Sequence, residues 1–427
     1  MKPTYLFLFS LSFASPLRAT PELSLGEVTE AVLAHNPRIE EARAKWAAMR
    51  ERVPQSAAWA DLRVSADSVA GRFVNISPNG FTDQKLSVEQ ELPISGKNRS
   101  RARIAAAEAI VMFEEARRAE LDVVAEARAA YFRLANAWAQ LELNRQNQVS
   151  LRQIAEISRS RYEVGKQTAG AVLVAETESG KLAETERDLQ QKIAEEQSAL
   201  NVLMNRDAFA PLARPNESAL PVTGFSIKEL RALTLANRPE VRVAEAKLAA
   251  ENSRLELAHR AWIPDPALSL QGSRYNDTGR AVSEVGAGIS FLVPWSNSGK
   301  YSAAVREARS NRAAARAALE RAQKESLGSL RDALQKVETA QHHVELFRDQ
   351  LLPQARQTFE ANQFSYESGQ AAFSDWISAQ RNLREIAGLA REHVADAQAA
   401  FADLEAVVGA DLKIFSPLRR ARQPDNK

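Results

Sequence analysis

Helical and strand patterns alternate along this chain, and the same series occurs in each half. In the first half, residues 24–57, 97–162 and 168–205 have the composition and apolar spacing of helices, whereas residues 62–66 and 86–92 alternate apolar and polar side chains as strands do. The second half predicts helices over 226–260, 300–366 and 371–408 and strands around 268–270 and 285–291. Each half therefore predicts a helix, a β-hairpin, a long helix and a returning helix, with hairpin turns at 75–79 and 276–279.

The two long helices carry the apolar spacing of a coiled coil. Steps of three and four residues occur at matching places of the two halves, at Val124, Ala127, Tyr131, Leu134, Trp138 and Leu141, and at Leu327, Leu330, Leu334, Val337, Gln341 and Val344. Neither Gly nor Pro interrupts the first long helix, whereas Gly328 and Pro353 fall within the second. A helix of this size extends about 100 Å.

The two halves are copies of one unit of about 200 residues, which is far longer than a solenoid repeat. Asn-Pro at 36–37 returns as Arg-Pro at 238–239, and Ser-Gly-Lys at 95–97 returns at 298–300. Ser24 and Ser226, each followed three positions later by Glu, predict capped helix starts. We expect a first repeat at 20–210, a linker at 211–224, a second repeat at 225–410 and a tail at 411–427.

The first 19 residues predict a secretory signal. Lys2 precedes an apolar stretch, and small residues offer cleavage after Ala14 or Ala19. The chain has no Cys, which excludes disulfides and a lipid-bearing cysteine, so we expect an exported protein that is not lipidated. Its net charge of +2 gives no electrostatic reason to expect nucleic acid as a partner.

The predicted parts favour a membrane conduit. The four strands are expected as two separate hairpins that need a partner, because an isolated hairpin is marginal in water and open edges are not tolerated in lipid. Three copies would supply twelve strands, an even number within the range of outer-membrane barrels. The same symmetry would place the long helices side by side as a hollow α-barrel.

The duplication, the Ala-rich opening helix with its Asn-Pro, and the Arg-Tyr-x-x-Gly turn at 161–165 resemble the TolC family of outer-membrane efflux proteins, over essentially all of the mature chain. Segments 90–97 and 291–300 resemble its heavy-metal efflux (CzcC-like) branch. The resemblance implies a mainly α fold with a small β part: a homotrimer whose 12-stranded transmembrane β-barrel, with four strands from each protomer, continues as a periplasmic α-helical coiled-coil barrel.

The implied function is that of a passive outer-membrane duct in a tripartite efflux system, for which heavy-metal cations are the first choice of cargo. Its partners would be a periplasmic adaptor (membrane fusion protein), an inner-membrane RND-type pump and outer-membrane lipid. The resemblance implies neither an enzyme nor a cofactor. General multidrug export and type I secretion stay open as alternatives.

The resemblance also implies that the tips of the helical hairpins form the periplasmic gate and the docking site for the adaptor. The matching positions are Arg161, Tyr162, Glu163, Gly165, Tyr366, Glu367, Gly369 and Asp375. The two tyrosines either close the gate or pack between helix ends, and the three acids either favour cations at the entrance or form solvated helix ends. A gate arginine that some relatives carry falls on Ala371 here.

Other chemistry is weakly represented in the sequence. Gly-Lys at 96–97 and 299–300 lacks the spacing of a phosphate loop and predicts strand-to-helix corners. The neighbours His342 and His343 face different directions on a helix, and the mature chain otherwise offers three methionines, so we expect no dedicated metal site.

Two other classes of protein explain fewer of these sequence features than an outer-membrane channel does. A periplasmic coiled-coil adaptor should have one hairpin flanked by β-domains, and a structural coiled coil would leave the strands and the signal unexplained.

Overall fold

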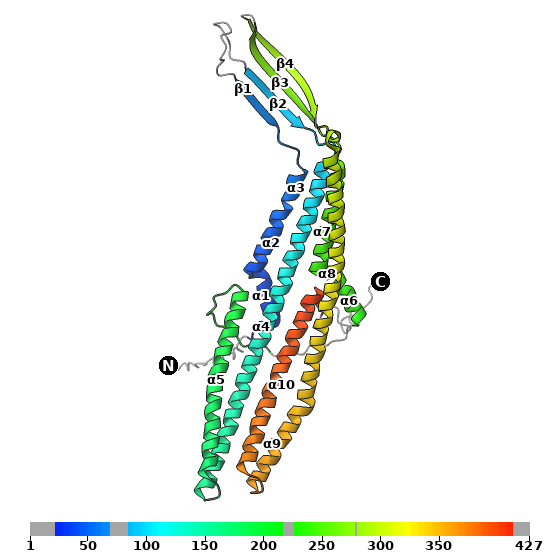
Figure 1. Cartoon of the computed structure of the whole chain (residues 1–427). Coiled ribbons are helices and arrows are strands. Elements are labelled where there is room, and N and C mark those ends of the chain that lie inside the picture. The colour runs from blue at the N-terminus through cyan, green and yellow to red at the C-terminus, as the bar shows by residue number, and fades with distance from the viewer. Residues whose placement is uncertain (1–21, 69–83, 217–225, 278–279, 413–427) are drawn as a thin grey trace, which may run out of the picture. The chain divides into compact units, whose positions relative to one another are not determined.

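A computed structural model describes residues 22–68, 84–216, 226–277 and 280–412 (Figure 1). Its elements occur in the same order in each half, as predicted. The first half contains α1 (Leu25–His35), α2 (Pro37–Arg50), α3 (Arg52–Ala57), β1 (Arg63–Ser68), β2 (Gln84–Glu91), α4 (Lys97–Glu163) and α5 (Ala169–Leu203). The second half contains α6 (Ile227–Asn237), α7 (Pro239–Arg260), β3 (Pro266–Asp277), β4 (Arg280–Phe291), η1 (Pro294–Asn297), α8 (Ser298–Leu346), η2 (Phe347–Leu351), α9 (Leu352–Glu367) and α10 (Phe373–Val408). The expected signal, the turn at 75–79 and most of the tail lie outside the described residues.

The prediction of one unbroken opening helix in each half is wrong, because a proline divides each of them. Asn36 and Arg238 adopt extended backbone angles, with ψ of 124° at both, and Pro37 and Pro239 then occupy the first turn of α2 and α7. A residue before proline avoids the helical region, whereas proline itself suits a helix start. The predicted caps are confirmed, since Ser24 and Ser226 each exchange hydrogen bonds with the Glu three positions later.

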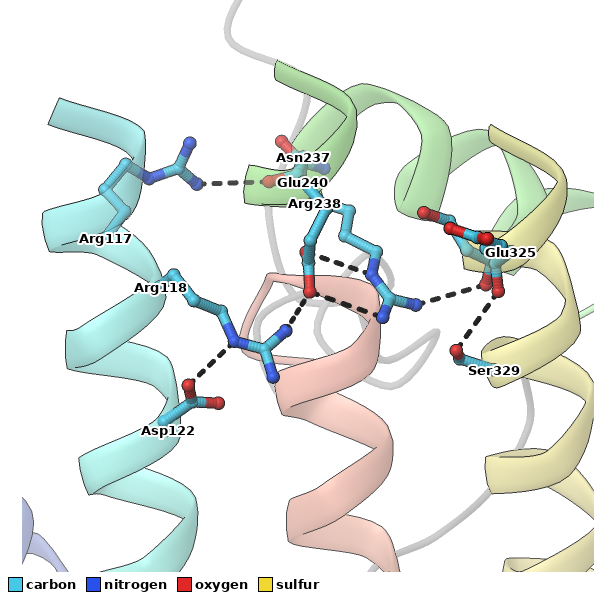
Figure 2. A network of polar contacts seen from close by, with 9 residues as sticks. Arg117, Arg118, Asp122, Asn237, Arg238, Glu240, Glu325 and Ser329 are labelled. Carbon is cyan, nitrogen blue, oxygen red and sulfur yellow. Dashed lines mark hydrogen bonds and ion pairs between the residues drawn. The ribbon is translucent and has the colours of Figure 1, made fainter. Parts of the chain in front are cut away.

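The break between α6 and α7 is held by a partly buried polar network around the buried Arg238 (Figure 2). Arg238 donates from Nε to Glu240 Oε2 at 3.0 Å and from Nη1 to the carbonyl oxygen of Ser326 at 3.2 Å. Glu240 also pairs with Arg118, whose Nε donates to Asp122 at 2.8 Å. Burial alone would raise the pKa of Glu240, but Arg238 and Arg118 outweigh it and hold that pKa below its usual value. The network therefore joins α4, α7 and α8 at the point where the chain bends.

Gly409 lies against the same break. Its φ is +75°, and a Cβ atom there would lie 2.9 Å from the carbonyl oxygen of Asn237. Both the backbone angle and the close approach require glycine.

The strands form one antiparallel sheet in the order β1-β2-β3-β4 (Figure 1). The expectation of two separate hairpins is wrong, because β2 pairs with β3 from Gln84 opposite Arg274 to Glu91 opposite Ala267. This central pairing unites the two copies of the repeat in one sheet. Apolar side chains of the sheet, including Val64, Leu270, Val285 and Ile289, are more than half exposed.

The predicted strand-to-helix corner at 96–97 is confirmed between β2 and α4, and the side chain of Asp265 holds it in place. The carboxylate of Asp265 accepts hydrogen bonds from the backbone N–H and the hydroxyl of Ser95, both at 2.8 Å, and pairs with Lys97 at 2.9 Å. In the second half, η1 makes the corner and Gly299 lies in the first turn of α8, so the predicted equivalence of the two Gly-Lys positions is wrong.

The first long helix, α4, has 67 residues without interruption. The second, predicted over 300–366 with Pro353 inside it, is helical throughout but contains the π-helical segment η2 between α8 and α9, just before Pro353. Proline lacks the N–H that an α-helix requires and crowds the carbonyl four residues earlier, and a wider turn relieves both problems. None of the helices in the described ranges has a stretch long and apolar enough to cross a lipid bilayer.

The chain forms two compact units, and each unit draws on both repeats. Of the described residues, unit 1 contains 22–34, 126–216 and 340–399, and unit 2 contains 35–68, 84–125, 226–277, 280–339 and 400–412. The core of unit 2 gathers Leu230, Leu330, Ala333, Val337, Phe401, Leu404, Val408 and Leu412. The core of unit 1 gathers Leu151, Ile154, Ala175, Leu182, Tyr366, Trp376 and Ile377.

Candidate functional site

The eight predicted site residues all lie in unit 1, at the turns between α4 and α5 and between α9 and α10 (Figure 1). Each turn contains a glycine with a positive φ, +72° at Gly165 and +81° at Gly369. Left-handed backbone of this kind ends a helix after its last residue, so the turn reverses the chain within a few positions. A Cβ atom at either glycine would meet no atom within 4 Å, so the backbone angle is what requires glycine there.

Arg161 links the two turns. From the last turn of α4, its Nη1 and Nη2 donate to the carbonyl oxygens of Tyr366 and Glu367 at 2.8 and 2.7 Å. These carbonyls end α9, where the helix dipole is negative and a cation is stabilising. The guanidinium carbon also lies 4.5 Å from the ring centroid of Tyr366. We call this set of contacts the tip link.

The two tip tyrosines have different surroundings although they occupy matching positions of the repeat. Tyr162 is 50% exposed, whereas Tyr366 is 3% exposed. The Tyr366 ring stacks on Trp376 with centroids 4.9 Å apart and meets Phe373 edge-on. Among the described residues, neither the Tyr366 hydroxyl nor the Trp376 indole N–H has a hydrogen-bond partner. Tyr366 is therefore a packing residue of this chain, and any hydrogen bond of its hydroxyl would need a group from elsewhere.

The acidic candidates are all exposed: Glu163, Glu367 and Asp375 lie on the surface at the tips. Glu367 accepts a hydrogen bond from Gln363 at 2.9 Å. Their exposure fits either of the predicted roles, a cation-attracting entrance or solvated helix ends.

The sequence did not single out Glu178, whose carboxylate is buried on α5, about two and a half helical turns from the tip. Its side chain is 2% exposed and pairs with Lys181 at 2.8 Å, Arg381 at 3.0 Å and Arg384 at 3.5 Å. Burial alone would raise the pKa of Glu178, but its hydrogen bonds with Lys181 and Arg381 outweigh burial and hold the pKa below its usual value. The carboxylate ties α5 to α10, and the sequence around it looks like any charged helix face.

An open cleft of about 600 Å³ lies between the two turns. Arg161, Tyr366 and Gly369 line it, together with the cations Lys166 and Arg381. The N-terminal residues of α5 and α10 form its other walls. We call it the tip cleft. Three cationic side chains and no carboxylate line it, so it suits an acidic or neutral polar occupant.

Known proteins resemble this chain in sequence and in fold. A family model described as outer membrane efflux protein matches residues 28–206 and again residues 230–410. The probable efflux pump outer membrane protein SepC and the toluene efflux pump outer membrane protein TtgF, from two strains of Pseudomonas putida, are each 29% identical over 230 residues. That stretch is 52% of this chain and 47% of each relative, so the chain matches about half the length of these curated proteins.

Among solved structures, the channel CusC has the same fold. Its TM-score is 0.77 at 17% identity, with 96% of this chain and 99% of CusC covered. Since the family model matches most of the sequence in two copies and the fold is that of such channels, the chain belongs to the outer membrane efflux protein family.

Proposed function

We propose that this protein is the outer-membrane channel subunit of a tripartite efflux system and acts as a passive conduit. The observation that carries the proposal is the double match to the efflux family along a duplicated helix–hairpin–helix fold. Both rival classes predict otherwise, because an adaptor and a structural coiled coil lack this duplicated series of elements.

The channel would be a homotrimer. One chain supplies four antiparallel strands with exposed apolar side chains, and four strands alone leave two edges to be paired. Three copies would supply the twelve strands of a closed outer-membrane barrel. The test is the mass of the detergent-solubilised outer-membrane protein: a trimer is expected, and a stable monomer would contradict the arrangement.

The tips would form the periplasmic gate, and the tip cleft would receive the adaptor. The tip link supports a gate because it joins the two hairpins through Arg161, a contact that opening would break. The cationic lining of the cleft supports an adaptor segment with acidic or neutral polar residues. Cross-linking from a cysteine placed at Lys166 should capture the adaptor, whereas one at Val202, which is exposed at the end of α5 away from the tips, should not.

Heavy-metal cations are the proposed cargo, on the strength of the turns at 90–97 and 291–300 that resemble the heavy-metal branch. The second candidate is a general multidrug or organic-solvent duct, which the relative described as a toluene efflux protein favours. Export of a polypeptide through a type I system is the third.

The deciding experiment deletes the gene and measures minimum inhibitory concentrations for divalent metals, copper and silver beside dyes, detergents and toluene. Sensitivity confined to metals would support the metal assignment. Sensitivity confined to organic compounds would replace it with the second candidate. Unchanged sensitivity throughout would contradict an efflux role.

A further inference from the structure

The fold brings three of the five histidines of the chain together in unit 1. His342 and His343 lie near the end of α8, and His393 lies on α10. The ring centroids of His343 and His393 are 4.9 Å apart, with an angle of 52° between the ring planes. The ring of His342 is 6.4 Å from that of His343, and its side chain is exposed. The sequence presented only the neighbouring pair, so the approach of His393 is new information from the fold.

Two contacts hold the ring of His393. Phe347, the first residue of the π-helical segment η2, packs edge-on against it with centroids 4.6 Å apart. Asp396 Oδ2 lies 3.8 Å from His393 Nδ1. The carboxylate lies on the Nδ1 side of the ring, which leaves Nε2 as the nitrogen for a metal.

We propose that His343 and His393 form a two-imidazole site for a divalent transition-metal cation such as Cu²⁺ or Zn²⁺, which would bridge α8 and α10. The distance supports a shared ion. With metal–nitrogen bonds of about 2.0 Å and ring centroids about 1.1 Å further out, two imidazoles on one ion have centroids about 4.4 Å apart at a right angle and about 5.1 Å apart at a tetrahedral angle. The observed 4.9 Å falls between these values.

Imidazole nitrogen is a preferred ligand of copper, zinc and nickel ions, which accounts for the chemical class of the cation. The described part of the chain holds no group of three or more His, Asp or Glu side chains arranged around a metal position. The remaining positions on the ion therefore belong to water, and we expect a weaker, exchangeable site rather than a structural one. Simple packing of the two rings against Phe347 would give no metal binding at all.

The proposal rests on these side chains and not on the nature of the cargo. A channel for organic compounds could carry the site, and a metal channel could lack it. Its test is therefore a binding measurement that is independent of the resistance assay.

The experiment titrates the full-length protein, purified in detergent without a histidine tag, with Cu²⁺. Electron paramagnetic resonance of the bound ion should show nitrogen hyperfine coupling, and calorimetry with Zn²⁺ should show a saturable site. His343→Gln and His393→Gln should each weaken binding by about tenfold or more. His342→Gln and His259→Gln are the matched controls and should bind as the wild type does.

Two results would overturn the proposal. One is a wild-type spectrum without nitrogen coupling, which needs no variant and so does not depend on how the variants fold. The other is equal binding by the wild type and the double variant His343→Gln/His393→Gln, which would assign the ion to another place.

Discussion

Replacing Arg161 by alanine should open the proposed gate. The substitution removes both hydrogen bonds of the tip link and the contact of the guanidinium with the Tyr366 ring. Hydrogen bonds to a charged group contribute about 1.5–3 kcal/mol each, but one of these is partly buried and the other exposed, so solvent screening reduces the pair to about 2 kcal/mol in total. A loss of about 2 kcal/mol raises the open-to-closed ratio about 30-fold.

The assay is the conductance of purified protein in planar bilayers, measured per channel. Arg161→Ala should increase the open fraction, and Arg161→Lys should give an intermediate value because lysine keeps the charge but cannot donate to both carbonyls. Arg159→Ala is the control, since Arg159 lies on the same helix and pairs with exposed Glu176 of α5 at 2.6 Å. If Arg161→Ala and Arg159→Ala conduct equally, the tip link does not hold the gate.

Three further substitutions test the tips and the helix break. Glu178→Gln should lower the free energy of unfolding by about 1–3 kcal/mol at neutral pH. Because folding lowers the pKa of Glu178, the carboxylate stabilises the fold above its unfolded-state pKa of about 4.3, and this stabilisation disappears as the pH falls through the folded-state pKa. An equal loss of stability in Glu176→Gln, which changes an exposed carboxylate, would contradict the role of Glu178. Tyr366→Phe should leave thermal stability unchanged or raise it slightly, because the hydroxyl is buried without a hydrogen-bond partner among the described residues. A marked loss of thermal stability would instead indicate a gate hydrogen bond formed in the assembly. Gly409→Ala should destabilise the fold by about 2 kcal/mol or more, because residue 409 has a positive φ and lies close to Asn237. Gly328 lies in open space on α8, so Gly328→Ala should stabilise the fold by about 0.5–1 kcal/mol. Similar melting temperatures for the two variants would refute this difference.

The order of the elements could be read from the sequence because local patterns determine it. Alternation identified the strands, the absence of Gly and Pro between residues 97 and 162 predicted the uninterrupted α4, and Gly165 and Gly369 marked the turns. The prolines mark where helical regularity fails, but they were not used to predict breaks. Pro37, Pro239 and Pro353 each coincide with a break in regular α-helix, and the wrong predictions came from giving them less weight than the apolar spacing.

Contacts between distant segments could not be predicted in this way. The pairing of β2 with β3 depends on two hairpins far apart in sequence, and nothing in either hairpin specifies the other. The ion pairs of Glu178 likewise depend on α5 packing beside α10, since only Lys181 is a sequence neighbour. The unequal burial of Tyr162 and Tyr366 follows from the same cause, because the two copies of the repeat share a pattern but meet different neighbours.

The interleaving of the two units has a consequence for biosynthesis. Unit 1 is incomplete until residues 340–399 are available, and the core of unit 2 still lacks Phe401, Leu404, Val408 and Leu412 at that point. A chain that emerges from its N-terminus can therefore complete neither unit until nearly all of it has been made. Domains of ordinary proteins fold one after another during synthesis, whereas here neither unit can complete its core before the last part of the chain is made. A premature stop anywhere before residue 340 should leave no stable fragment, and the product should be removed by proteolysis rather than accumulate as a half-length repeat.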